Sequence, residues 1–248
     1  MHARRQPASH GILWLLASFR LFRANPPLLS ALTLGYLFLA FAAIALPPIG
    51  PFLVSLASPA MVVIVANGCR AIERGRGISL IAMTHGLKSH RVALVRLGGL
   101  LLLGSIVVLF VSTAIEGGQI SLVGPTRPIG DDEMVGFMAR YLLIALPVIA
   151  AFWYAPLLTA WEGVPPMKSL FFSFVACWRN WRAFAAYSLA VVVVAVVLPG
   201  LLLTLVATVS RVLHDLLSVA LMMVIVPIIM AGVYISYQDV FHRPGDVE

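Results

Sequence analysis

The stretch GILWLLASFRLFRANPPLLSALTLGYLFLAFAAIAL, residues 11–46, contains the unit from which we expect the whole fold to be built. Residues 11–23 are apolar except for a narrow stripe with Ser18, Arg20 and Arg23, a pattern typical of a helix lying among lipid headgroups. The segment RANPP then disfavours helix and favours a new helix start, because proline suits the first helical position. The apolar run that follows is long enough to cross a bilayer.

The composition of the chain agrees with this interpretation. Hydrophobic residues make up 61% of the sequence and charged residues 11%, with a mean hydropathy of +1.00. Soluble domains contain about a quarter charged residues, so we predict a single integral membrane domain over residues 1–248. The net charge of +7 does not indicate nucleic acid as a partner, because the basic residues lie in short segments beside hydrophobic runs.

Six hydrophobic runs have the length of about 20 residues that a spanning helix requires. They are residues 28–46, 52–67 with a short extension past Cys69, 92–115, 141–161, 183–208 and 216–237. The longest polar connection, residues 116–140, is predicted to be the main outer loop, and its acidic cluster is Asp131, Asp132 and Glu133. We interpret that cluster as part of a solvated loop, with cation binding as the less favoured alternative.

Three shorter amphipathic segments precede alternate spans, at residues 11–23, 78–88 and 167–178, and each leads into a basic elbow. The third is about 18 Å long as a helix and is too short to cross a core of about 30 Å. It must therefore lie flat or re-enter the membrane. If it lies flat, we expect its apolar residues to face acyl chains or neighbouring spans and Lys168, Ser169 and Ser173 to lie toward water. The predicted fold class is therefore all-α: a polytopic membrane protein with six transmembrane helices and three interfacial amphipathic helices.

An internal threefold repeat follows from the same pattern, over residues 11–73, 78–162 and 167–239. Each copy has a surface helix, a basic elbow, a span, a turn and a proline-containing span that ends in an acidic residue, namely Glu73, Glu162 or Asp239. The alternative is that basic elbows simply recur at every second connection of a membrane protein. We favour the repeat.

The distribution of the 17 lysine and arginine residues predicts the orientation. With the N-terminus inside, only Arg127, Arg140 and Arg211 fall outside, so both termini are expected in the cytoplasm. Since no cleavable leader is recognised and Cys69 and Cys177 fall near cytoplasmic helix ends, we expect a bacterial inner-membrane protein with free thiols.

No catalytic constellation is recognisable in the sequence. Membrane catalysis and proton relay usually leave ionisable residues inside spans, and only Arg96 comes near that position, as a snorkelling side chain. The histidines His85, His90 and His214 lack metal-ligand spacing, and no phosphate-binding or hydrolase motif is present. We therefore expect no enzyme activity, no metal and no cofactor.

Two groups of residues are the candidate sites. Basic and aromatic residues at the elbows are expected to contact lipid headgroups: Arg20, Arg23, Lys88, Arg91, Trp178, Arg179, Trp181 and Arg182. Aromatic residues and prolines around the fourth span could line an apolar cavity between helices: Pro147, Trp153, Tyr154, Pro156 and Trp161. Aromatic packing and anchoring at the interface is the alternative for this second group.

The segments LFRANP (21–26), WYAPLLTAW (153–161) and CWRNW (177–181) resemble those of an uncharacterised family of bacterial six-span inner-membrane proteins. That family is distantly similar to the membrane domain attached to some glycerophosphodiester phosphodiesterases. The resemblance covers most of the chain and implies the six-span fold. The phosphodiesterase domain with its metal ligands is absent from this sequence, so the resemblance carries no activity over.

Two functions are compatible with these features. The preferred hypothesis is a non-catalytic inner-membrane protein that binds, organises or moves lipid or another amphipathic molecule, because surface helices surround an uncharged interior. The alternative is an assembly or scaffold subunit that contacts other membrane proteins, or a second copy of itself, through small-residue helix faces. The expected partners are therefore membrane lipids and membrane proteins.

Overall fold

A computed structural model describes residues 3–46, 49–75, 79–115, 120–121, 124–125 and 131–241. The elements in chain order are α1 (Ser9–Ala24), α2 (Pro26–Ile44), α3 (Gly50–Glu73), α4 (Leu80–Met83), α5 (Leu87–Ile115), β1 (Ile120–Ser121), β2 (Gly124–Pro125), α6 (Asp131–Trp153), α7 (Ala155–Glu162), α8 (Pro166–Arg179), α9 (Trp181–Val192), the π-helical η1 (Val193–Val197), α10 (Leu198–Ala207) and α11 (Arg211–Phe241). The two-residue strands pair antiparallel, with Ile120 opposite Pro125. Arg76 and Arg127 lie outside the described residues.

Six of the described helical segments are long and apolar enough to cross a membrane, so the all-α, six-span prediction is confirmed. They are Pro26–Ala43, Gly50–Glu73, Ile81–Ile115, Glu133–Glu162, Trp181–Ala207 and Arg211–Phe241. Helix propensity alone does not explain such lengths. In hydrocarbon a helix satisfies its own backbone polar groups, and that requirement favours helix throughout each apolar run.

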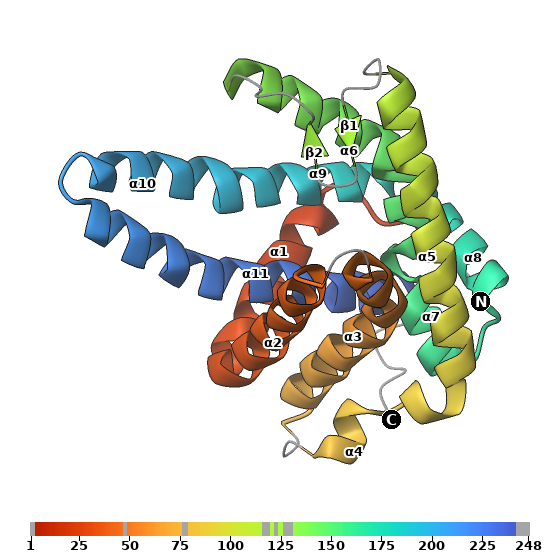
Figure 1. Cartoon of the computed structure of the whole chain (residues 1–248). Helices are drawn as coiled ribbons and strands as arrows, with labels where there is room; N and C mark the ends of the chain where they lie inside the picture. The colour runs from red at the N-terminus through yellow and green to blue at the C-terminus, as the bar shows by residue number, and fades with distance from the viewer. Residues whose placement is uncertain are drawn as a thin grey trace.

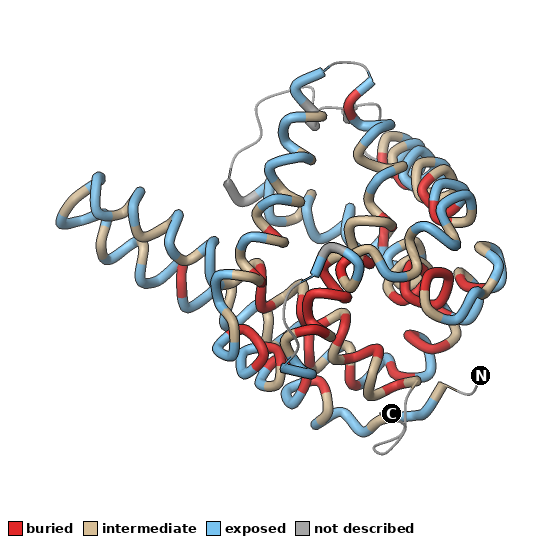
Figure 2. Tube along the Cα trace, turned by 90° about the horizontal axis from the view of Figure 1, so that it is seen from below, coloured by how far each residue is buried: buried red, intermediate tan, exposed pale blue. Residues whose placement is uncertain are grey.

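The spans form three helical hairpins: α2 with α3, α5 with α6, and α9–α10 with α11 (Figure 1). The third hairpin projects away from the rest of the molecule, in a different direction from α5 (Figure 1). Buried residues gather where the hairpins meet, whereas the far part of the third hairpin is mainly exposed (Figure 2). We refer to the meeting region, which contains the basic segments, as the elbow side, and to the far ends as the tips.

Two of the three predicted surface helices form as expected, α1 and α8. Helix α1 packs closely on the third hairpin, because Gly11 leaves room for the backbone of α9: a Cβ there would overlap Ala183 and Tyr187. Its other buried residues, Trp14, Leu15, Ser18, Leu21 and Phe22, continue this contact face.

The predicted extent of the second surface helix, residues 78–88, is wrong. Helix α4 is a single turn, and Gly86 follows it with a φ of 80°, a left-handed conformation that interrupts any helix. The side-chain amide of Asn67 donates to the carbonyls of Met83 (2.8 Å) and His85 (3.0 Å). This turn is therefore held by α3 through hydrogen bonds that periodicity in the sequence does not reveal.

Each elbow contains one residue whose backbone departs from helical geometry, just before or within the span that follows. These residues are Asn25 (φ −153°, ψ 77°), His90 (φ −118°, ψ 21°) and Asn180 (φ −107°, ψ 19°). The side chain of Asn25 accepts from the backbone N–H of Leu28, which caps α2. The chain thus changes direction at three comparable places.

Helix α6 begins ten residues before the predicted fourth span, so the acidic cluster at 131–133 occupies its first turn rather than a loop. Negative charge is favourable there, because the first turn of a helix presents unpaired N–H groups. The predicted outer loop is correspondingly shorter than residues 116–140.

The fourth span is broken at Tyr154, two residues before Pro156, whose ring prevents a regular helix. The hydroxyl of Ser173 in α8 bonds the two backbone groups at this break: it donates to the carbonyl of Ala150 (2.7 Å) and accepts from the N–H of Tyr154 (2.9 Å). Ser169, one turn earlier, contacts the hydroxyl of Thr159 (3.0 Å). The expectation that both serines lie toward water is wrong, since α8 buries them together with Ala176 and Cys177.

Proline also explains the π-helical turn in the fifth span. Pro199 has no N–H, and in a regular α-helix its ring would clash with the carbonyl four residues earlier. The wider turn η1 immediately precedes it, with the N–H of Leu198 bonded to the carbonyl of Val193. The helix therefore continues across the membrane-length run as one span.

Replacing Ser173 with alanine should destabilise the protein by about 1–3 kcal/mol, because a buried carbonyl and a buried N–H both lose their partner. Thermal unfolding in detergent would measure the effect. Ser105→Ala is the matched control, since the Ser105 hydroxyl is exposed and bonds only the carbonyl of Leu101 on its own helix. Equal midpoints for the two variants would contradict the role given to Ser173.

Candidate functional site

The residues predicted to contact headgroups are all exposed. They lie on the elbow side: Arg20 and Arg23 at the end of α1, Lys88 and Arg91 at the start of α5, and Trp178, Arg179, Trp181 and Arg182 around Asn180. The guanidinium of Arg23 lies 5.9 Å from the ring centre of Phe19, and that of Arg182 lies 5.6 Å from Trp181. Cations and rings therefore share one exposed surface at two of the elbows.

Helix α8 presents its aromatic residues outward. Phe171 is 63% exposed and Trp178 is 72% exposed, while Phe174 stacks on Trp178 with ring centres 6.3 Å apart. Because the small polar residues of α8 face the protein, its outer face is aromatic and its end carries Arg179. We define the elbow surface as Phe171, Phe174, Trp178, Arg179, Trp181 and Arg182.

The residues proposed for an apolar cavity lie in a packed aromatic core. Tyr154 is fully buried and makes edge contacts with Phe184, Tyr237 and Phe241, at 5.3–6.0 Å between ring centres. Trp153 makes similar contacts with Phe184 at 5.6 Å. These rings fill the space between helices, so the described contacts favour the packing alternative over a ligand cavity.

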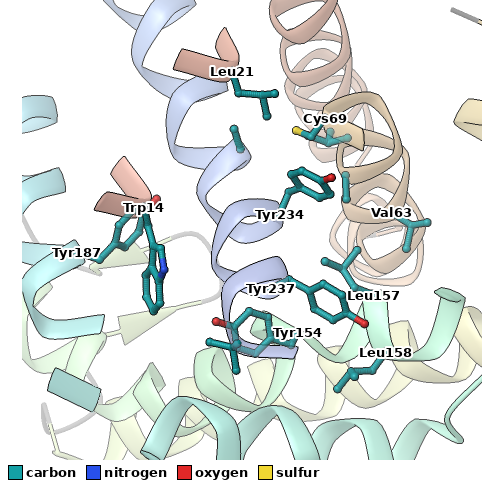
Figure 3. Close-up of a cluster of buried hydrophobic side chains, with 14 of the residues drawn as sticks. Trp14, Leu21, Val63, Cys69, Tyr154, Leu157, Leu158, Tyr187, Tyr234 and Tyr237 are labelled. Atoms are coloured by element: carbon teal, nitrogen blue, oxygen red, sulfur yellow. The ribbon is translucent and has the colours of Figure 1, made fainter. Parts of the chain in front are cut away.

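Trp161, Pro147 and Pro156 complete that group. The indole N–H of Trp161 donates to Asn67 (3.0 Å), and its ring contacts Tyr234 and Tyr237. Pro147 lies inside α6 and Pro156 starts α7, where both shape the span. Figure 3 shows Tyr234 and Tyr237 directed from α11 toward Cys69 and Leu157, with Trp14 on the other side of α11.

The acidic span ends anchor two polar networks that the sequence reasoning did not identify. The first surrounds Asp239 near the end of α11. Its carboxylate accepts from the indole N–H of Trp14 (2.7 Å) and from the side chain of Gln6 (3.1 Å), and it contacts Nδ1 of His10 at 2.8 Å. Since Trp14 is almost completely buried, this carboxylate fixes α1 against α11.

The segment before α1 forms an extended strap across the same region. Asn180 accepts from the backbone N–H of Gln6 (2.7 Å) and donates to the carbonyl of Arg4 (2.9 Å). The N–H of Arg4 donates to the carbonyl of Val240 (2.9 Å). The strap therefore connects the third elbow with the end of α11.

The second network lies at the ends of α3, α7 and α11, and we name it the Arg70 cluster. It contains Arg70, Glu73, Trp161, Glu162, Tyr234 and Tyr237. The hydroxyl of Tyr234 donates to Glu73, and that of Tyr237 donates to Glu162 at 3.2 Å. The guanidinium of Arg70 lies over the ring of Trp161, 3.9 Å from its centre.

A sequence signal for both networks was present. The sequence places all three acidic residues at span ends, but an acidic residue after an apolar run is normally a solvated helix end. These acidic residues differ from solvated helix ends only in the side chains that donate hydrogen bonds to them, and those donors lie in distant parts of the chain. Tyr234, for example, is 161 residues from Glu73. Pairings at such separations do not follow from the local pattern.

Two observations concern metal-binding and nucleophilic groups among the described side chains. No group of three or more His, Cys, Asp or Glu residues within the described ranges could hold a metal ion. Cys177 is buried in α8, and this burial raises the pKa of its thiol to about 12. The thiol is therefore protonated at neutral pH and is a weak nucleophile there.

Fold and surface together define a multi-pass membrane protein with apolar hairpins and a basic, aromatic elbow side. The chain is 34% identical over 194 residues to a probable inner membrane protein of Burkholderia thailandensis, and the match covers 73% of this chain and 72% of that relative. The chain belongs to the family of that inner membrane protein. No family model matches the chain, and no solved structure does.

Replacing Asp239 with asparagine should loosen the strap, because an amide group cannot accept from Trp14, Gln6 and His10 at the same time. We expect faster proteolytic cleavage within residues 3–8 of the purified protein, by about tenfold if about 1.4 kcal/mol of local stability is lost. Asp215→Asn is the control, since that carboxylate is 80% exposed near the tip of the third hairpin. Unchanged cleavage in Asp239→Asn would show that the strap is held by its backbone contacts alone.

Proposed function

We propose that the chain is a non-catalytic inner-membrane protein that binds and organises lipid, with anionic headgroups held at the elbow surface. The observation that carries this proposal is the orientation of α8, which turns its small polar residues toward the protein and its aromatic residues outward. Its polar residues Ser169 and Ser173 are buried, and its exposed face is aromatic with Arg179 at its end. Aromatic rings with neighbouring arginines suit the boundary between acyl chains and phosphates.

The third hairpin supports the same proposal. No residue of η1 is buried, and in α10 only Pro199 is. Its exposed side chains include Val196, Leu201 and Leu205, and the hydroxyls of the neighbouring Thr204 and Thr208 are bonded to carbonyls of their own helix. A surface of this kind is stable only when acyl chains or another apolar surface cover it.

A scaffold subunit is the second candidate. Gly35, Gly99 and Gly200 leave open space where a Cβ would stand, so another helix could approach closely there. Against this, Gly11, Gly98 and Gly232 have their small faces occupied within the chain, by Ala183, Leu56 and Tyr187 respectively. Three small-residue faces are thus already used for internal packing, which favours the lipid role.

The threefold repeat, the cytoplasmic position of both termini and the absence of enzyme activity belong to this proposal. Similar backbone breaks at His90 and Asn180 support the repeat. The concentration of basic residues on the elbow side supports its assignment to the cytoplasm. The distant similarity to the membrane domain of glycerophosphodiester phosphodiesterases stays a prediction.

The orientation can be tested by labelling with a membrane-impermeant maleimide. Glu133→Cys, at an exposed position in the first turn of α6, should be labelled on intact spheroplasts. Arg74→Cys, exposed at the end of α3, should be labelled only after lysis. The native thiols Cys69 and Cys177 are buried and give the background. The opposite pattern would reverse the topology.

The elbow surface can be tested by charge reversal. Arg179→Glu with Arg182→Glu should weaken retention of phosphatidylglycerol by about 1 kcal/mol per removed charge, and by more because the charge is reversed. Native mass spectrometry of the purified protein measures the retained lipid. Arg179→Lys with Arg182→Lys keeps the charge and should keep the lipid.

The same spectra separate the two candidate functions. If the amount of retained lipid falls in the glutamate variant and is kept in the lysine variant, the lipid role is supported. Equal lipid retention in the parent and the glutamate variant, with a second membrane protein at fixed stoichiometry, would replace the lipid role with the scaffold role.

A further inference from the structure

The turn between α2 and α3, at the tip of the first hairpin, carries no polar side chain. Every residue from 37 to 54 is apolar, glycine or proline. The described turn residues Leu46 and Ile49 are 58% and 61% exposed. The tip of the third hairpin differs, because it carries two exposed charged residues, Arg211 and Asp215. An exposed apolar tip of the first kind is stable only when another apolar phase or surface covers it.

The backbone of this turn leaves few donors for water. Four N–H groups donate to carbonyls of the same hairpin at 2.7–3.1 Å, those of Ala45 (to Phe41), Leu46 (to Ala43), Gly50 (to Leu46) and Leu53 (to Ile49). Three further residues have no N–H, because they are the prolines Pro47, Pro48 and Pro51. Seven of the nine residues 45–53, these four and the three prolines, therefore need no water at their nitrogen. Such a turn can lie in hydrocarbon, where an unpaired N–H is costly.

The polar side chains nearest to the turn also bond inside the hairpin. The hydroxyl of Tyr36 in α2 contacts that of Ser58 in α3 at 3.2 Å. The hydroxyl of Ser55 donates to the carbonyl of Pro51 at 2.9 Å. Because these hydroxyls have partners within the hairpin, they do not require the tip to reach water.

The length of the first hairpin sets a limit on its reach. Helix α2 has 19 residues and is about 28 Å long, slightly less than a hydrocarbon core of about 30 Å. Any tilt shortens its reach further. The fifth span has 27 residues and is about 40 Å long, so the third hairpin can carry its charged tip beyond the core. The first hairpin starts at a basic elbow and ends within the opposite leaflet.

We propose that the turn of the first hairpin ends among the acyl chains of the leaflet opposite the elbow side and does not emerge into water. Acyl chains are the occupant that fits, because Phe38, Leu39 and Phe41 are exposed on different faces of α2. A single protein partner would cover one face, whereas fluid lipid covers all of them. Both helices remain spans, and lipid headgroups close over the tip. This inference concerns the far end of the molecule and does not rest on the lipid role of the elbow surface.

The test is spin labelling of the full-length protein in vesicles of phosphatidylethanolamine and phosphatidylglycerol. A nitroxide on Ile49→Cys should collide several-fold more often with oxygen, which concentrates in hydrocarbon, than with a water-soluble nickel chelate. Val209→Cys, at an 80% exposed position on the tip of the third hairpin, is the matched control and should show the opposite preference. The parent protein gives the background, since Cys69 and Cys177 are buried.

Each outcome decides the proposal. Nickel collisions at Ile49→Cys as frequent as those at Val209→Cys would place the turn in water and overturn it. Rare collisions with both reagents would show that protein, such as a second copy of the chain, covers the tip in place of lipid, and this also overturns it. The thermal midpoint checks folding, and if Ile49→Cys does not fold, Leu46→Cys on the other side of the turn gives the same measurement.

Discussion

The structure depends on side chains that satisfy backbone groups at the places where helices break. An unpaired N–H or carbonyl costs several kcal/mol in hydrocarbon or in a buried part of the protein, so a break in a buried segment requires a partner. Ser173 supplies both partners at the break before α7, Asn67 binds two carbonyls at and just after the end of α4, and Asn180 connects the third elbow with the strap. Each of these side chains is buried.

This constraint sets the direction in which the surface helices face. Because Ser169 and Ser173 are needed inside to bond Thr159 and the broken span, α8 must turn its small polar face inward. Its aromatic residues then have only the outer face left. The exposed Phe171 and Trp178 are thus a consequence of backbone satisfaction, and the lipid-facing surface follows from the same cause.

Spans and elbows were predictable from the sequence, because hydrophobic length and prolines act locally. The six runs, the helices α1 and α8 and the exposure of Arg179, Trp181 and Arg182 follow from such local signals. The extent of the second surface helix did not follow, since it depends on the left-handed Gly86 and on hydrogen bonds from Asn67 of α3 to Met83 and His85. The polar networks were missed for the same reason: Asp239 pairs with Trp14 across 225 residues.

The three acidic span ends illustrate how one sequence feature serves different purposes. Asp239 is paired with Trp14 and Gln6 and holds the packing of α1 on α11. Glu73 and Glu162 are exposed and lie with Arg70, whose donors are not used by the described residues. One acidic span end therefore fixes the packing of two helices, whereas the other two stay exposed at the protein surface, a difference that the sequence pattern alone does not show.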